Sequence, residues 1–115
     1  MVKKKSYVPN RGDIIWIDFR PTRGHEQSGW RPALVLTHRR YNQQTKLAIV
    51  CPLTLESKGY LAEVPVMVNN KMAVVLSNQI RNVDWQHRGV KFIAKADHIV
   101  LFKVQENIRV LLHED

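Results

Sequence analysis

The sequence has few of the residues on which disulfide-bonded, zinc-binding and membrane proteins depend. It contains one cysteine, Cys51, so the chain forms no internal disulfide and has no cysteine cluster for zinc. No apolar run approaches the ~20 residues that span a bilayer, and no apolar segment follows the basic residues Lys3, Lys4 and Lys5. These absences predict a soluble, cytoplasmic protein with no membrane partner.

Two common kinds of binding site also lack their residues. The histidines show no i, i+4 pairing and no companion cysteines (His25, His38, His87, His98 and His113). Gly24 and Gly29 do not continue into the GK[ST] sequence of a phosphate-binding loop. We therefore expect no metal and no cofactor.

Positive charge is present in excess. The chain has 18 Lys and Arg against 10 Asp and Glu, which gives a net charge of +8 and an isoelectric point near 10.0. Residues 1–58 hold 11 basic and 4 acidic side chains, whereas residues 59–115 hold 7 and 6. Such a field attracts polyanions. Nucleic acid, or an acidic protein that imitates it, is the favoured partner over lipid or a merely solvated basic face.

The apolar pattern predicts one mainly β domain over residues 1–115, with a basic, flexible start at 1–9. Short runs rich in β-forming residues predict strands at 13–19, 33–37, 47–51, 72–76 and 91–95. A period of two at 61–68 predicts a half-exposed strand, which Pro65 restricts to a sheet edge or a bulge. We interpret Trp16, Phe19, Met67 and Met72 as core residues and Cys51 as a buried strand residue.

The pattern becomes helical at the end of the chain. After Asp97, a suitable N-cap, apolar residues recur at helical spacing and predict a helix over 97–113 (Leu101, Val104, Ile108 and Leu111). Further apolar residues widen this face, so we expect the helix to pack on the strands (Val100, Phe102, Val110 and Leu112). Short strands with one terminal helix predict a small β-barrel.

Chemically active side chains gather in the segment Gly24-His25-Glu26-Gln27-Ser28-Gly29-Trp30-Arg31-Pro32. Cleavage of a phosphodiester needs a base, a cation for the phosphate oxygens and a proton donor, which Glu26, Arg31 and His25 could supply. The same composition also fits a simple salt bridge between Glu26 and Arg31. Trp30 could stack on an unpaired base or anchor a dimer contact, and both interpretations stay open.

Several segments match one known family in order and spacing. They are GDIIWIDFRPTR, GHEQSGWRPALVL, YNQQTKLAIVCPLT, SKGY, VVLSNQIR and residues 85–89. Through them the chain resembles the MazF/PemK family of bacterial toxin endoribonucleases, also called Kid or ChpB, from Gly12 to the C-terminal helix.

The resemblance implies an SH3-like small barrel of short antiparallel strands with a C-terminal α-helix, acting as a homodimer. It also implies the toxin component of a type II toxin-antitoxin system. Such toxins are sequence-specific, metal-independent endoribonucleases that cut single-stranded mRNA, leave 2′,3′-cyclic phosphate and 5′-hydroxyl ends, and inhibit translation and growth. The implied protein partner is a cognate antitoxin whose acidic tail occupies the RNA groove.

The family's catalytic residues fall on Glu26, Arg31 and Thr54. By resemblance, Glu26 accepts the 2′-hydroxyl proton, Arg31 stabilises the pentacoordinate phosphorane, and Thr54 holds a phosphate oxygen. We predict that a further set binds RNA: His25, Gln27, Trp30, Lys58, Asn78, Gln79 and Arg81. His25 ranks as a substrate-binding residue first and a proton donor second.

One departure from the family pattern narrows the mechanism. Several relatives have Asp where this chain has Asn78, and one branch has Arg where it has Leu76, so a base built on that pair is not available here. Two other functions remain as alternatives: a non-enzymatic toxin resembling the gyrase-poisoning CcdB family, and a passive RNA-binding barrel. The chain lacks the terminal aromatic and Gly-Ile ending of the CcdB family, because it closes on His113-Glu114-Asp115.

Overall fold

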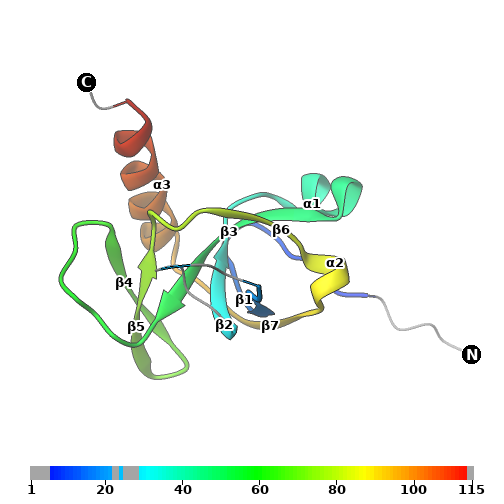
Figure 1. Cartoon of the computed structure of the whole chain (residues 1–115), viewed down its shortest axis with the longest axis horizontal. Helices are drawn as coiled ribbons and strands as arrows, with labels where there is room; N and C mark the ends of the chain where they lie inside the picture. The colour runs from blue at the N-terminus through cyan, green and yellow to red at the C-terminus, as the bar shows by residue number, and fades with distance from the viewer. Residues whose placement is uncertain (1–5, 22–23, 25–28, 114–115) are drawn as a thin grey trace, which may run out of the picture.

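The protein is built on one curled antiparallel sheet. A computed structural model describes residues 6–21, 24 and 29–113. The strands are β1 (Asp13–Asp18), β2 (Trp30–Val35), β3 (Leu47–Thr54), β4 (Glu63–Val68), β5 (Lys71–Leu76), β6 (Arg81–Asp84) and β7 (Val90–Lys95). The helices are α1 (Arg39–Thr45), α2 (Trp85–Arg88) and α3 (His98–His113). The sheet curls into a half-barrel, and α3 lies at the opposite end from α1 and α2 (Figure 1).

The long strand β3 explains why the sheet curls. The strand order is β4-β5-β3-β2-β1-β7, and β6 also pairs with β3. The first half of β3, from Leu47 to Val50, pairs with β6, whereas Leu53 and Thr54 at its end pair with β5. Two different strands therefore extend from the same edge of β3, and the sheet turns away from a plane where they separate.

Alternating side chains of the central strands fill two separate cores. Ile14 and Leu34 pack with β4, β5 and the buried Val104 of α3. Ile15 and Ile17 point to the other face of β1 and pack with Trp85 of α2 and with Val83 of β6. Most of the ladder β1–β2–β3 is thus covered on both faces, so these three strands form a rigid centre of the fold.

The structure confirms the mainly β fold and the terminal helix. Pro65 lies in β4, which is an edge strand of the sheet, and Val64 and Val66 are buried as the period of two predicted. The helix begins after Asp97, whose carboxylate Oδ1 accepts a 2.9 Å hydrogen bond from the backbone N–H of Ile99. None of the helices in the described part of the chain is long and apolar enough to cross a membrane.

Some core predictions were wrong. Phe19 and Cys51 are buried, but Trp16 is 38% exposed, Met67 58% and Met72 56%. The two methionines are direct partners in the β4–β5 register, on the outer face of that hairpin, so they pack outside the core. The wide apolar face of α3 does not all pack on the sheet either, because several of its side chains are exposed (Phe102, Val110, Leu111 and Leu112).

Three elements were not predicted from the sequence, namely α1, β6 and α2. Each is short and mostly polar, so its own apolar pattern is weak. They form because their few buried side chains fit existing partners. Trp85 of α2, for example, is buried in the second core and donates its indole N–H to the backbone oxygen of Asn42 in α1 at 3.0 Å.

A buried carboxylate attaches the N-terminal segment to the sheet. Asp13 in β1 is buried, and its Oδ2 accepts hydrogen bonds from the Tyr7 hydroxyl at 2.5 Å and the Asn10 backbone N–H at 3.0 Å. Its Oδ1 accepts from Lys95 Nζ of β7 at 3.0 Å. Burial and the neighbouring Asp13 carboxylate raise the pKa of Tyr7, so its hydroxyl stays protonated as a donor.

We predict that Asp13→Asn destabilises the protein by roughly 1–3 kcal/mol, because one amide oxygen cannot serve donors on both sides of the original carboxylate. Urea unfolding followed by circular dichroism measures the difference in the free energy of unfolding. Asp97→Asn is the matched control, since Asn also caps helices well and should leave stability nearly unchanged. Equal stability of the two variants would mean that the Asp13 network contributes nothing.

Candidate nucleic-acid interface

A cavity of about 730 Å³ opens where β1, β2 and β3 end beside the β4–β5 hairpin. Its walls come from four parts of the chain: β1 and β2, the end of β3 with the connection that follows, and the β4–β5 hairpin. The lining residues are Trp16, Trp30, Arg31, Pro32, Leu53, Thr54, Leu55, Glu56, Lys58, Val68, Asn69, Lys71 and Ala73. Three cationic side chains and one carboxylate lie among them, so the part of the lining that the structure describes carries net positive charge.

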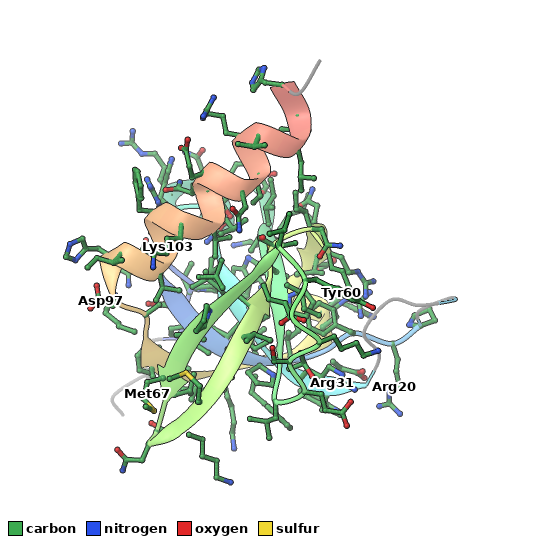
Figure 2. The ribbon with its side chains drawn as sticks, turned by 90° about the vertical axis from the view of Figure 1, so that its left-hand side faces the viewer. Arg20, Arg31, Tyr60, Met67, Asp97 and Lys103 are labelled. Atoms are coloured by element: carbon green, nitrogen blue, oxygen red, sulfur yellow. The ribbon has the colours of Figure 1, made fainter. Side chains whose placement is uncertain are left out.

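The paired strands bring Arg31 and Thr54 to the same cavity. Arg31 lies opposite Ile17 of β1, and Thr54 is the last residue of β3. Both are half-buried. Thr54 Oγ1 accepts the backbone N–H of Glu56 at 3.2 Å, which fixes the hydroxyl and leaves its proton for an oxygen of a ligand. Figure 2 shows Arg31 on the side of the molecule away from Asp97 and Lys103 of α3.

Two arginines hold the base of the β1–β2 connection. Just beyond the end of β1 and before the start of β2, the Phe19 backbone N–H donates a 2.9 Å hydrogen bond to the backbone oxygen of Gly29. Arg81 donates to the Phe19 oxygen at 2.9 Å and lies over its ring at 5.2 Å from the centroid. Arg88 donates to the backbone oxygens of Asp18 and Arg20, both at 2.6 Å. The segment between Arg20 and Gly29 therefore starts and ends at fixed points.

The structure assembles part of the predicted site. Of the predicted residues that it describes, Trp30, Arg31, Thr54 and Lys58 line the cavity. The other described members of the set do not line it: Asn78, Gln79 and Arg81. Arg81 instead contacts Phe19. The remaining predicted residues, His25, Glu26 and Gln27, lie outside the described residues.

The sequence interpretation missed Trp16, Asn69 and Lys71 as lining residues. The pattern of β1 contained information that would have identified Trp16. Ile15 and Ile17 alternate toward one core, so Trp16 belongs to the opposite face together with the charged Asp18. Asn69 and Lys71 reach the cavity only because the β4–β5 hairpin folds beside it.

Glu63 organises the connection that carries Lys58. Its carboxylate accepts the Ser57 hydroxyl at 2.6 Å, the Lys58 backbone N–H at 2.9 Å and the Gly59 backbone N–H at 3.2 Å. These bonds favour the ionised carboxylate. The Ser57 hydroxyl first, and then the Lys58 N–H, hold the pKa of Glu63 below its ordinary value.

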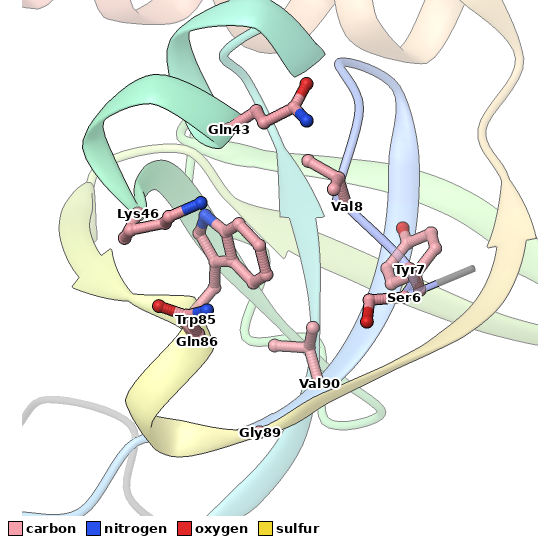
Figure 3. A pocket seen from close by; sticks show the side chains of 9 residues that line it. All are labelled: Ser6, Tyr7, Val8, Gln43, Lys46, Trp85, Gln86, Gly89 and Val90. Carbon is pink, nitrogen blue, oxygen red and sulfur yellow. The ribbon is translucent and has the colours of Figure 1, made fainter. Parts of the chain in front are cut away.

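A second cavity of about 580 Å³ lies between the N-terminal segment, α1 and α2. Figure 3 shows Trp85, Lys46 and Tyr7 among its lining side chains. None of the predicted site residues that the structure describes lines it. Within residues 6–21, 24 and 29–113, no group of three or more His, Cys, Asp or Glu side chains is placed to hold a metal ion.

The fold and the first cavity define a class: a small β domain with a basic, aromatic-lined depression suited to a single-stranded polyanion. Comparison with known proteins identifies the family. Residues 10–112 match the family described as PemK-like, MazF-like toxin of type II toxin-antitoxin system. The chain belongs to this family, which confirms the resemblance drawn from its motifs.

Individual relatives agree along nearly the whole chain. The endoribonuclease toxin MazF of Escherichia coli strain K12 is 39% identical over 106 residues, covering 90% of this chain and 96% of the relative. The crystal structure of MazF (Form-I) from Deinococcus radiodurans superposes with a TM-score of 0.88 at 41% identity, covering 93% of this chain and 98% of that one. A MazE-MazF structure (Form-II) from the same organism gives 0.82 at 35% identity, covering 96% and 100%.

We predict that the backbone amides of Lys58 and Gly59 report the ionisation of Glu63. Because the folded pKa is lowered, the ordering that Glu63 provides is complete above its ordinary pKa and is lost as the pH falls through the depressed value. In NMR spectra recorded during acid titration, both amide resonances should move with a midpoint below the ordinary Glu value of about 4.3. Glu63→Gln should abolish this transition and Glu56→Gln should not. A midpoint at the ordinary value would contradict the proposed hydrogen bonds.

Proposed function

We propose that the protein is the toxin of a type II toxin-antitoxin system and acts as an endoribonuclease on single-stranded mRNA in the cytoplasm. The observation that carries the proposal is the meeting of Arg31, Thr54, Trp30 and Lys58 in one cavity at the end of the sheet. The relative named above as an endoribonuclease toxin, MazF of Escherichia coli strain K12, supports it. A gyrase-poisoning protein would have no need for this set of phosphate-binding side chains.

The mechanism that fits these residues uses the RNA as its own nucleophile. Glu26 takes the proton of a 2′-hydroxyl, and the resulting oxygen attacks the adjacent phosphorus. The bond from phosphorus to the 5′-oxygen then breaks, and that oxygen takes a proton from His25 or Arg31. The products are a 2′,3′-cyclic phosphate and a 5′-hydroxyl, and no metal-bound water takes part.

Arg31 and Thr54 act on the phosphate in this scheme. The Arg31 guanidinium stabilises negative charge on the pentacoordinate phosphorane, which is where a fixed cation accelerates a reaction. The hydroxyl of Thr54, oriented by the Glu56 N–H, donates to a second phosphate oxygen. Asn78 has no carboxylate and is exposed between β5 and β6, so the base remains Glu26.

The proposed partners follow from charge and exposed apolar surface. Arg31, Lys58 and Lys71 give the cavity a positive lining that suits RNA and equally suits the acidic tail of a cognate antitoxin. The protein is proposed to be a homodimer. Exposed apolar side chains on α3, such as Phe102, with Leu61 at 98% exposure beside them, support contact with a second copy.

For the chemistry, we predict that Arg31→Ala lowers the cleavage rate by about 10²–10³, the effect of losing one donor to developing charge. Glu26→Gln should nearly abolish cleavage while RNA affinity holds or rises, because a negative charge facing phosphate is removed. Thr54→Val should cost about tenfold or less, since one neutral hydrogen bond is worth roughly 0.5–1.5 kcal/mol. Single-turnover cleavage of a long unstructured RNA in EDTA, with end mapping, measures all three.

Two results would contradict this scheme. Near-normal cleavage by Glu26→Gln would place the base elsewhere, and His25 would be the next candidate. Loss of wild-type cleavage in EDTA would exclude a mechanism that needs only the 2′-hydroxyl. The matched control is Glu56→Gln, which removes a carboxylate from the lining without touching the proposed chemistry and should retain the order of magnitude of the wild-type rate.

For the assembly, we predict a dimer in sedimentation experiments at micromolar concentration. Phe102→Glu should shift the equilibrium toward monomer, because it would bury a charge at an apolar contact. Arg40→Glu is the control, since it introduces the same carboxylate at an exposed position of α1, at the opposite end of the molecule from α3. Monomer alone for the wild type would exclude a stable homodimer.

A further inference from the structure

Two tryptophans lie side by side on the wall of the larger cavity. Trp16 is the register partner of Pro32, and Trp30 is two residues before Pro32, so both indoles lie on the same face of the β1–β2 pair. Their ring centroids are 6.4 Å apart and their planes differ by 20°. Trp16 is 38% exposed and Trp30 44%, so the pair presents a large aromatic surface to solvent.

The surroundings of the pair identify what it can hold. Arg31, Lys58 and Lys71 line the same cavity. Lys91 of β7 is the register partner of Trp16 and is exposed, so it extends the positive charge along the same face. Aromatic surface flanked by cations binds single-stranded nucleic acid, because bases stack on the rings while the cations contact phosphates.

The β4–β5 hairpin contributes a further part of the lining of this cavity. Asn69 and Asn70 form its turn with φ of 48° and 66°, the left-handed pair of a tight two-residue hairpin. The turn places Asn69 in the lining of the same cavity as the two tryptophans. The described lining therefore combines the two indoles with three cations, the hydroxyl of Thr54, the carboxylate of Glu56, the amide residue Asn69 and several apolar residues.

We propose that Trp16 and Trp30 form a single base-stacking subsite, which holds one unpaired RNA base next to the phosphate bound by Arg31 and Thr54. This inference rests on the proposed function and adds Trp16 and the paired geometry to it. Every base has a π-face, so the subsite contributes affinity with little dependence on sequence. Discrimination between bases is left to hydrogen-bonding groups such as Asn69.

Tryptophan fluorescence tests the subsite without any cleavage. The probes are short, fully 2′-O-methylated oligouridine and oligoadenosine, which a 2′-hydroxyl mechanism cannot cut. Both should quench wild-type fluorescence, because stacked bases quench indoles, and the single variants Trp16→Phe and Trp30→Phe should each retain quenching of the remaining indole. The third tryptophan, Trp85, is buried in the second core and serves as an internal reference whose emission stays constant.

Affinity measurements with the same probes test Trp16 itself. Trp16→Ala should weaken binding roughly 5- to 150-fold, which corresponds to the loss of one stacked base. Trp16→Phe should recover most of the affinity, because a ring is restored. The matched control is Phe92→Leu, an exposed aromatic that follows Lys91 and points to the other face of β7, and it should bind like the wild type.

Abasic substitution then locates the base. In an RNA that spans a mapped cut, removing the base at one position should weaken binding to the wild type as much as Trp16→Ala does. The same substitution should cause no further loss in Trp16→Ala. Equal loss at every position, or losses that simply add to that of the variant, would overturn the proposal.

The outcomes separate this inference from the proposed function. If RNA is cut normally but leaves the fluorescence of Trp16 and Trp30 unchanged, the stacking subsite is wrong and the endoribonuclease proposal stands. If the probes quench the fluorescence but no RNA is cleaved, the stacking subsite stands and the endoribonuclease proposal is wrong. If Trp16→Ala instead dissociated the dimer and left the affinity of each subunit unchanged, the pair would be an interface between copies and the proposal would be wrong.

Discussion

The ladder formed by β1, β2 and β3 is the element on which the rest of the structure depends. Along most of its length its side chains are covered on both faces, with Ile14 and Leu34 in one core and Ile15 and Ile17 in the other. Toward one end the cover on one face stops, and Trp16 and Trp30, on the face opposite to Ile15 and Ile17, are exposed beside Arg31. The cavity is therefore the uncovered end of a ladder that is otherwise rigid, and its residues need no mobile scaffold to meet.

The excess of positive charge serves two purposes. Arg81 and Arg88 are engaged with backbone oxygens of Phe19, Asp18 and Arg20 and hold the base of the β1–β2 connection. Lys95 neutralises the buried Asp13. The cations left at the cavity are a smaller group, which includes Lys58 and Lys71. Net charge alone thus overstates the surface available to RNA, because several cations are part of the fold.

One acidic residue near the cavity, Glu63, also acts as part of the fold. Glu63 accepts three hydrogen bonds from the Ser57–Gly59 segment and so fixes the backbone that carries Lys58. Its charge is compensated locally by donors and faces the connection. A polyanion approaching Lys58 therefore meets an ordered main chain, which reduces the entropy lost on binding.

Much of the fold could be predicted from the sequence, because it depends on short-range periodicity. The alternation at 61–68 identified an edge strand around Pro65, and the helical spacing after Asp97 identified α3. Family motifs named Arg31, Thr54 and Trp30, which the fold brings together, and also Asn78 and Gln79, which lie outside the cavity. The short elements α1, β6 and α2 escaped prediction because they are stabilised by tertiary contacts such as the bond from Trp85 to Asn42.

The sequence by itself determined which residues alternate, where the chain turns and how much charge it carries. Only the tertiary structure decided which face of each strand stays uncovered. That depends on how far α3 and the β4–β5 hairpin extend over the sheet, and the strand's own residue pattern does not contain this information. For this reason Trp16, Met67 and Met72, apolar residues in apolar strands, are exposed. It also explains how Asn69 and Lys71 lie in one cavity with Trp30, which is far from them in the sequence.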